Sequence, residues 1–127
     1  MCRSCLVVDD SKPMRTAIKR TILRAGFNDL KILEAKNGKE ALSLLKSTPI
    51  DLIITDYNMP EMDGLEFITI LKGKTGYKDI PVLLMTGEIN EARLNKFKNI
   101  DVAVQIPKDI RPEELKPILS STLNESV

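Results

Sequence analysis

Five polar residues of this chain each follow an apolar run: Asp9, Asp10, Asp56, Thr86 and Lys108. The run before Asp56 reads Leu-Ile-Ile-Thr and is apolar on both faces, which is typical of a buried parallel strand. Ligands of parallel sheets bind where the carboxyl ends of the strands meet. We therefore expect acidic, hydroxyl and cationic side chains to gather at one edge of a sheet.

The charges of these residues favour a divalent cation and a phosphoryl group. Three carboxylates carry −3 and Lys108 carries +1, which leaves −2 and would raise the pKa of at least one carboxyl group. Mg²⁺ brings this sum to zero, prefers oxygen ligands and often bridges to a phosphate. Asp56 would be the nucleophile that forms an acyl phosphate, and Lys108 would neutralise charge on the transferring group. Thr86 would donate a hydrogen bond to the same group.

Each residue also has an ordinary structural interpretation when it is taken alone. An aspartate at a strand end often forms a turn or caps a helix, and this applies to Asp56 and to the Asp9-Asp10 pair. A lone lysine such as Lys108 is usually a solvated surface residue. Their coincidence at one sheet edge favours a site. Three other aspartates are expected to be structural, at a helix start or at the opposite strand ends: Asp63, Asp51 and Asp101.

Apolar runs alternate with helical patterns along the whole chain. Strands are predicted at residues 5–8, 30–33, 51–55, 81–85 and 102–106. Helices are predicted after Ser11, Asn37-Gly38, Asp63, Asn90 and Arg111-Pro112. This alternation predicts an α/β fold, a doubly wound five-stranded parallel sheet with five helices, as one domain over residues 1–127. Pro117 indicates either a kink in the last helix or a helix that starts late.

Charge and composition exclude several classes of function. With 19 basic and 18 acidic residues the net charge is +1, so no basic face for nucleic acid is expected. The absence of histidine excludes His-based catalysis and His metal sites. The apolar runs are far shorter than the ~20 residues of a membrane span, and no signal peptide precedes Leu6, so we expect a cytoplasmic protein. Cys2 and Cys5 enter a strand, not a helix start, which favours structural thiols over a redox pair.

The motifs resemble those of the receiver domain of two-component response regulators, specifically the single-domain, CheY-like kind. The matching segments are Val7-Val8-Asp9-Asp10-Ser11, Asp56-Tyr57-Asn58-Met59-Pro60 with Asp63-Gly64, Met85-Thr86-Gly87, and Lys108. The resemblance covers essentially the whole chain. It implies a flavodoxin-like strand order, 2-1-3-4-5, which the sequence alone does not derive and which places the first and third strands side by side.

The resemblance also implies roles for individual residues. Asp56 would accept a phosphoryl group from a histidine kinase, while Asp10, Asp56 and the backbone carbonyl of Asn58 would bind Mg²⁺. Asp9 would assist the metal through a water molecule. Thr86 and Lys108 would then sense the phosphorylated state. The chain would be a signalling module, not an enzyme in the usual sense, although it would assist its own phosphotransfer and dephosphorylation.

Partners follow from the same resemblance. They are a sensor histidine kinase and a downstream protein that binds the surface of the fourth helix, fifth strand and fifth helix. No nucleic acid or membrane insertion is expected, and the chain would be a monomer or a weak dimer. Asn58 and Glu88 stand two residues after Asp56 and Thr86, where polar groups resemble those of fast-turnover chemotaxis regulators. A short-lived phosphoryl group is therefore predicted.

Two positions on the fifth strand depart from the family pattern. Gln105 stands where the family usually has an aromatic residue that moves inward with the threonine, so Gln105 would either stay exposed or form a hydrogen bond near Thr86. Pro107 precedes Lys108, whereas the family usually has a proline after the lysine. The usual cis Lys-Pro bond is therefore impossible, and Asp109 is a competitor for the lysine ammonium.

Alternatives to a phosphorylated receiver remain open at this point. A degenerate receiver would bind partners without phosphorylation, and a fragment of a larger regulator would act through a further domain. A phosphatase-like hydrolase usually needs a second acid where Asn58 stands. A flavin carrier needs a phosphate-binding loop where Asp9-Asp10 would repel phosphate.

Overall fold

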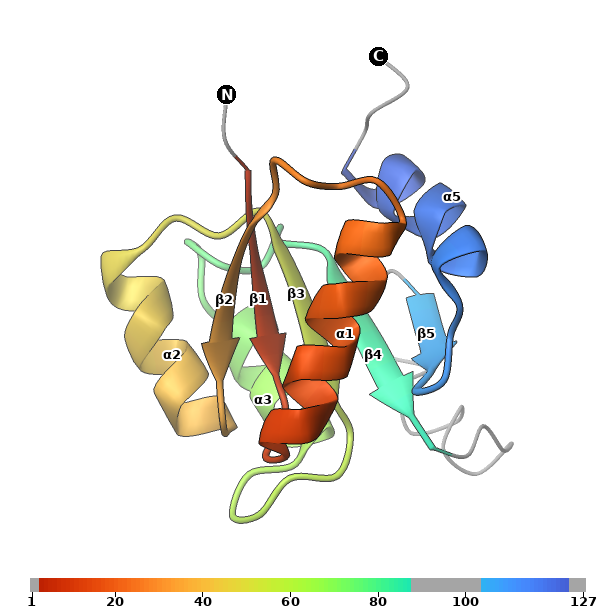
Figure 1. Cartoon of the computed structure of the whole chain (residues 1–127). Helices are drawn as coiled ribbons and strands as arrows, with labels where there is room; N and C mark the ends of the chain where they lie inside the picture. The colour runs from red at the N-terminus through yellow and green to blue at the C-terminus, as the bar shows by residue number, and fades with distance from the viewer. Residues whose placement is uncertain (1–2, 88–103, 124–127) are drawn as a thin grey trace.

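The computed structural model describes residues 3–87 and 104–123 of the chain. Strands and helices alternate along it (Figure 1). The strands are β1 (Ser4–Val8), β2 (Lys31–Ala35), β3 (Leu52–Asp56), β4 (Val82–Thr86) and β5 (Val104–Pro107). The helices are α1 (Lys12–Arg24), α2 (Gly38–Ser47), α3 (Gly64–Lys72) and α5 (Pro112–Thr122).

The five strands form one parallel sheet in the order β2-β1-β3-β4-β5, which confirms the expected topology. The pairing brings the carboxyl ends of β1 and β3 side by side, since Val8 pairs with Thr55. On the other side of β1, Val8 pairs with Ala35 of β2. At the far edge Thr86 of β4 pairs with Pro107 of β5. All five strand ends therefore point to one edge, the lower edge in Figure 1.

Helices cover both faces of the sheet. On one face α1 and α5 pack through buried residues such as Ile22 and Leu119 against Ile54 and Met85. On the other face α2 and α3 pack through Ala41, Phe67 and Ile68, among others. Figure 1 shows α1 in front of the sheet and α3 behind it. The sheet interior is buried on both sides, which explains why the central strands read as continuous apolar runs.

Three helices begin at the capping residues that the sequence predicts. The side chains of Ser11, Asn37 and Asp63 accept hydrogen bonds from backbone N–H groups three residues further on, at 3.2, 2.7 and 2.9 Å. Gly26, just after α1, adopts a φ of 102°, a left-handed conformation that favours glycine. Asp63 is thus the helix-start residue that was expected.

The structure differs from the sequence-based expectations in a few places. Asp56 is the last residue of β3, not the first residue of the following loop. The last helix begins at Pro112 and continues through Pro117, so a late start is wrong. The helix expected after Asn90 lies outside the described residues, as do Glu88 and Asp101. Asp51 is structural: its carboxylate accepts a 2.8 Å hydrogen bond from the backbone N–H of Ser4.

Burial accounts for the cysteine that the structure describes. Cys5 is fully buried in β1, and burial raises the pKa of its thiol to about 12. A thiol with this pKa is a poor nucleophile at neutral pH, which agrees with a structural role. Cys2 lies outside the described residues.

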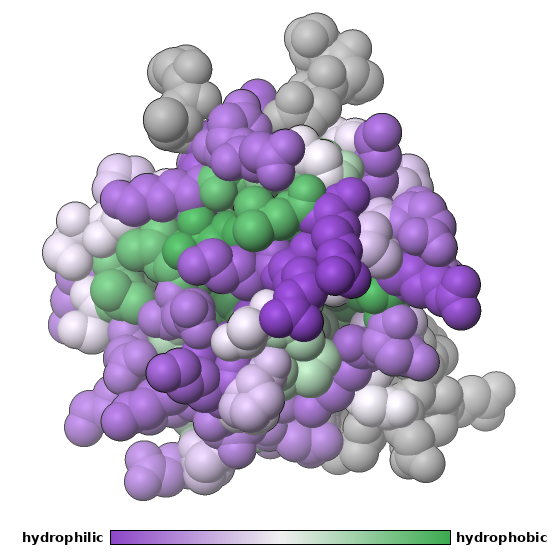
Figure 2. Space-filling view, viewed as in Figure 1, coloured by the Kyte–Doolittle hydropathy of each residue, from purple (hydrophilic) through white to green (hydrophobic). Residues whose placement is uncertain are grey.

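The surface of the face that carries α1 is mixed in character. Figure 2 shows hydrophilic side chains over the middle of this face and a hydrophobic band beside them. Leu23 of α1 is 39% exposed. Within the described ranges, no helix has the length and apolar character that crossing a membrane requires.

Candidate functional site

Asp9, Asp10 and Asp56 converge at the carboxyl ends of β1 and β3. One carboxylate oxygen from each residue lies within 4.8 Å of the others. Asp9 and Asp56 are each 1% exposed, whereas Asp10 lies open to solvent. The pairing of β1 with β3 positions all three, because Asp9 directly follows Val8 and Asp56 directly follows Thr55. The structure thus brings together the three acidic residues that the sequence singled out.

Asp9 is the acidic residue that burial perturbs most clearly. Its pKa is raised to about 6, mainly because burial disfavours the charged form, and the neighbouring carboxylates add to the effect. A 2.9 Å hydrogen bond from the backbone N–H of Ser11 to Oδ1 acts in the opposite direction. Oδ2 of Asp9 is buried, and it has no hydrogen-bond partner within the described part of the chain. An unpartnered buried carboxylate oxygen beside two more carboxylates is well suited to a hard cation.

Asp56 is held by a lysine from the opposite side of the site. The Nζ atom of Lys108 lies 3.0 Å from Oδ2 of Asp56. The backbone N–H of Asn58 donates a longer hydrogen bond, 3.4 Å, to Oδ1 of Asp56. Both carboxylate oxygens of this buried residue therefore have donors. The lysine ammonium contacts Asp56, so the expected competition from Asp109 does not displace it.

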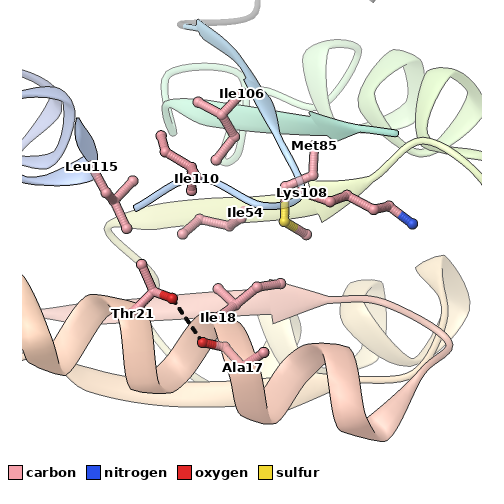
Figure 3. A pocket seen from close by; sticks show the side chains of 9 residues that line it. All are labelled: Ala17, Ile18, Thr21, Ile54, Met85, Ile106, Lys108, Ile110 and Leu115. Carbon is pink, nitrogen blue, oxygen red and sulfur yellow. Dashed lines mark hydrogen bonds between the residues drawn. The ribbon is translucent and has the colours of Figure 1, made fainter. Parts of the chain in front are cut away.

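Lys108 reaches the acidic residues along the wall of a small apolar cavity. Its stem helps to line a cavity of about 30 Å³ between α1, the sheet and α5. The other lining residues are mostly apolar, including Ile54, Met85 and Ile106. Figure 3 shows the lysine extending along this wall so that its nitrogen points away from the cavity. The aliphatic stem packs on apolar surface, and the ammonium group at its end lies at the strand ends beside Asp56.

Thr86 and Gln105 lie on the same face of neighbouring strands. Gln105 pairs with Leu84, and Thr86 is two residues beyond Leu84, so all three point to the face that α3 covers. The hydroxyl of Thr86 and Oε1 of Gln105 are both buried and lack hydrogen-bond partners in the described ranges. Gln105 is half-buried, so the expectation of an exposed side chain is wrong. A hydrogen bond to Thr86 is not formed in this structure.

The loop after β3 forms the open side of the site. An open hollow of about 400 Å³ borders Asp10 and is lined by the loop residues Tyr57, Asn58, Met59, Pro60 and Asp63. This hollow leaves the exposed carboxylate of Asp10 accessible. Gly64 packs so closely under the loop that a Cβ atom there would lie 2.6 Å from the carbonyl oxygen of Asp56. Glycine at this position, which has no Cβ atom, allows the start of α3 to approach the backbone of Asp56 this closely.

Sequence reasoning missed two residues that contact the site. Arg15 of α1 donates a 2.6 Å hydrogen bond to the backbone carbonyl of Asp9 and forms a 2.9 Å ion pair with Glu34 of β2. Nothing in the sequence pattern marks this contact, because it joins residues from three separate elements. Gly64 was recognised as part of a motif, but its close approach to Asp56 was not.

Comparisons with known proteins agree with this geometry. The sequence profile of the family described as response regulator receiver domain matches residues 5–120. A chemotaxis protein CheY homolog of Campylobacter jejuni is 40% identical over 119 residues, which are 93% of this chain and 90% of that protein. The chemotaxis protein CheY1 of Helicobacter pylori is 38% identical over 119 residues, covering 93% of this chain and 94% of that protein.

Solved structures give the same result. The chemotaxis protein CheY4 of Vibrio cholerae has a TM-score of 0.85 and 30% identity, and the match covers 96% of this chain and 99% of that chain. A signal receiver domain of an HD domain-containing protein from Pseudomonas fluorescens has a TM-score of 0.87, covering 98% and 97% of the two chains. At 21% identity it shows likeness of fold alone. The fold, the acidic cluster and the sequence matches lead to one conclusion: this chain belongs to the response regulator receiver domain family.

Proposed function

We propose that this chain is a phosphorylation-dependent signalling module that accepts a phosphoryl group on Asp56 from a histidine kinase. The observation that carries the proposal is the convergence of Asp9, Asp10 and Asp56 with the ammonium of Lys108 at one sheet edge. A buried carboxylate between two further acids and a lysine is difficult to explain by packing alone. It has the donors and charges that a transferring phosphoryl group requires.

Asp56 is the nucleophile in this proposal. One carboxylate oxygen attacks the phosphorus of a phosphohistidine, the new O–P bond forms, and the N–P bond breaks. The electron pair of the broken bond goes to the histidine nitrogen of the donor. The 3.0 Å contact with Lys108 supports this step, because the ammonium can follow the negative charge from the carboxylate to the phosphoryl oxygens.

A magnesium ion fits the donor atoms that this site offers. Oδ2 of Asp9 is buried without a partner in the described ranges, and oxygens of Asp10 and Asp56 lie nearby. With the backbone carbonyl of Asn58, these residues would hold Mg²⁺ directly or through water. When bound, Mg²⁺ neutralises negative charge on the site and on the phosphoryl group.

Thr86 is the proposed sensor of the phosphoryl group. Its hydroxyl is buried and lacks a hydrogen-bond partner in the part of the chain that the structure describes. A phosphoryl oxygen on Asp56 would supply an acceptor, and satisfying a buried donor favours movement of Thr86 toward it. The movement would alter the surface of β5 and α5 together with the segment between β4 and β5, where a downstream protein would bind.

The proposal includes transient signalling in the cytoplasm. Asn58 stands two residues after Asp56, and its backbone N–H contacts the Asp56 carboxylate at 3.4 Å, so a polar residue borders the place where water would attack the acyl phosphate. We expect a phosphoryl lifetime far shorter than hours. A phosphorylated form that persists for hours in the presence of Mg²⁺ would contradict this part of the proposal.

A phosphorylation assay with intact-mass detection tests the proposal. The protein is incubated with Mg²⁺ and acetyl phosphate, a small phosphodonor that needs no kinase. Wild type should gain the mass of one phosphoryl group, and Asp56→Asn should gain none. The variant Asp51→Asn is the matched control, because Asp51 precedes the other end of the same strand and should leave phosphorylation unchanged.

The degenerate-receiver alternative is decided by the same assay. If wild type gains no mass although it binds Mg²⁺, the chain would act by phosphorylation-independent binding. If Asp51→Asn and Asp56→Asn lose phosphorylation equally, Asp56 would not be the specific acceptor.

A further inference from the structure

Every polar group of Asp9 except one is committed to a hydrogen bond. The backbone N–H donates to the carbonyl of Ala35 at 3.1 Å, and Oδ1 accepts from the N–H of Ser11 at 2.9 Å. The backbone carbonyl accepts from Nη1 of Arg15 at 2.6 Å. Oδ2 is the remaining atom, and it is buried without a partner in the described part of the chain. The hydrogen bonds thus hold the residue so that one oxygen is left for the acidic site.

Arg15 makes the contact that joins three elements around the acidic site. It lies near the start of α1, its Nη1 contacts the loop after β1, and its Nε contacts Glu34 on β2 at 2.9 Å. Glu34 pairs with Val7 in the sheet, so the acceptor is attached to a rigid element. The side chains are 13% and 36% exposed for Arg15 and Glu34. The two donors of one planar guanidinium therefore bind acceptors on two different elements.

The bonded carbonyl belongs to the peptide unit that links Asp9 to Asp10. This unit is planar, so a hydrogen bond to its oxygen fixes the plane from which both residues extend. The carboxylate of Asp10 is exposed, and its backbone direction is set in this way. Orientation of Asp10 thus depends on Arg15, although Arg15 contacts neither carboxylate of the acid pair.

We propose that Arg15 is a positioning residue of the magnesium site, and that Glu34 orients it and cancels its charge. This inference rests on the proposed function, since it concerns the same metal site. Ordering a metal's ligands before the ion binds raises affinity, and loss of such an outer contact typically lowers affinity ~10-fold or more.

The charge of Arg15 alone would have the opposite effect on Mg²⁺ affinity, so the two roles of the residue can be distinguished by experiment. A cation near a magnesium site repels the ion, so removing Arg15 should strengthen binding if the residue acts only through its charge. If Arg15 acts by positioning the Asp9–Asp10 peptide, its removal should weaken binding. The Glu34 carboxylate cancels the charge of Arg15, so the ion pair as a whole repels the metal ion little.

Calorimetric titration with Mg²⁺ alone, without a phosphodonor, tests the inference. Arg15→Ala should bind Mg²⁺ about 10-fold more weakly than wild type. Arg15→Lys keeps the charge, but a single ammonium cannot reproduce both contacts, so its affinity should fall between the two. Arg20→Ala is the matched control: it removes the same charge from an exposed position on the same helix. Its affinity should equal that of wild type or slightly exceed it.

The Mg²⁺ affinity of the Arg15 variants decides whether the residue positions the acid pair. Equal or tighter binding by Arg15→Ala, with a urea unfolding midpoint close to that of wild type, would overturn the positioning role. If Arg15→Ala does not fold, Arg15→Lys decides, and wild-type affinity in that variant would overturn the inference. Failure of wild type itself to bind Mg²⁺ would instead overturn the proposed function.

Discussion

The ammonium of Lys108 lies 3.0 Å from the carboxylate of Asp56, and the two residues differ sharply in exposure. The lysine side chain is 32% exposed and the aspartate side chain is 2% exposed. Only the lysine can be hydrated if its partner is removed. The contact is therefore unequal. Loss of Lys108 leaves a buried carboxylate without its cation, whereas loss of Asp56 leaves an ammonium that water can solvate.

This inequality predicts different stability effects for the two partners. Lys108→Met leaves three carboxylates without their cation and should lower the free energy of unfolding by about 2–3 kcal/mol. Asp56→Asn removes one negative charge from the cluster and should leave stability unchanged or increased. Urea unfolding in EDTA at neutral pH measures both, and equal losses in the two variants would contradict this account.

Asp9 makes stability depend on pH in the metal-free protein. Its folded-state pKa of about 6 lies above the ordinary value of 3.8, so the folded state binds the proton more tightly than the unfolded state. Its contribution to stability is therefore present at low pH and is lost as the pH rises from about 4 through about 6. The full effect is about 3 kcal/mol at the conversion of 1.36 kcal/mol per pKa unit.

The difference between wild type and Asp9→Asn isolates this effect, because other titrating groups are common to both. In EDTA the stability advantage of Asp9→Asn should grow as the pH rises through that window. Mg²⁺ affinity of wild type should also rise over the same range, since the ion and the proton compete for one carboxylate. A constant difference between the two proteins from pH 4 to pH 7 would show that Asp9 is not perturbed.

Gly64 should be intolerant of even a methyl group. A Cβ atom there would lie 2.6 Å from the carbonyl oxygen of Asp56 and 2.9 Å from the Cα of Tyr57, and both are backbone atoms that cannot move aside cheaply. We expect Gly64→Ala to cost about 2 kcal/mol and to slow phosphorylation, because the clash displaces Asp56.

Gly73→Ala is the control for this substitution. Its Cβ would meet backbone oxygens at 3.6 Å, which is ordinary contact, and its φ of −84° suits alanine. Stability and the phosphorylation rate should stay close to wild type. Equal behaviour of the two glycine variants would refute the close-packing argument at Gly64.

Gln105 should respond to phosphorylation through a hydrogen bond. The buried Thr86 hydroxyl and Oε1 of Gln105 both lack partners in the described ranges. Once Thr86 donates to a phosphoryl oxygen, its own oxygen can accept from the amide of Gln105, because diagonal neighbours on adjacent strands are within reach of a long side chain. Binding of a phosphoryl mimic should therefore shift the Gln105 side-chain amide signal in NMR.

The assignment of that signal is direct, since Gln105 is the only glutamine in the sequence. Gln105→Met keeps the length of the side chain but removes the amide donor, and it should weaken binding of the phosphoryl mimic. An unchanged Gln105 side chain in crystal structures with and without the mimic would show that this residue takes no part in switching.

Local patterns in the sequence predict most of the fold. The apolar run before Asp56 indicates a strand buried on both faces, and Ser11, Asn37 and Asp63 mark helix starts because their side chains accept from the first free N–H groups. The sequence around Pro117 does not decide between a kink and a late helix start. It occupies an exposed turn of α5, while Leu115 and Leu119 on the same helix are buried, and their packing offsets the missing backbone hydrogen bond.

The site is less predictable where contacts depend on distant elements. The Arg15–Glu34 ion pair joins residues 19 positions apart, and its existence depends on how α1 lies against the sheet edge. The burial of Gln105 depends on neighbouring packing, which strand periodicity does not specify. Chemistry-bearing residues at strand ends can therefore be found from sequence, whereas the residues that orient them cannot.

The interior position of β1, between β2 and β3, has a consequence for how the chain folds. β1 pairs with β3 across more than forty intervening residues, as the bond from the N–H of Asp51 to the carbonyl of Ser4 illustrates. During synthesis the Asp9-Asp10 pair emerges early, but the acidic site lacks Asp56 until β3 has been made. Lys108 arrives later still. Because pairing between distant strands is slow, the acidic site should form late in folding, so the proposed Mg²⁺ binding would report a nearly complete native topology.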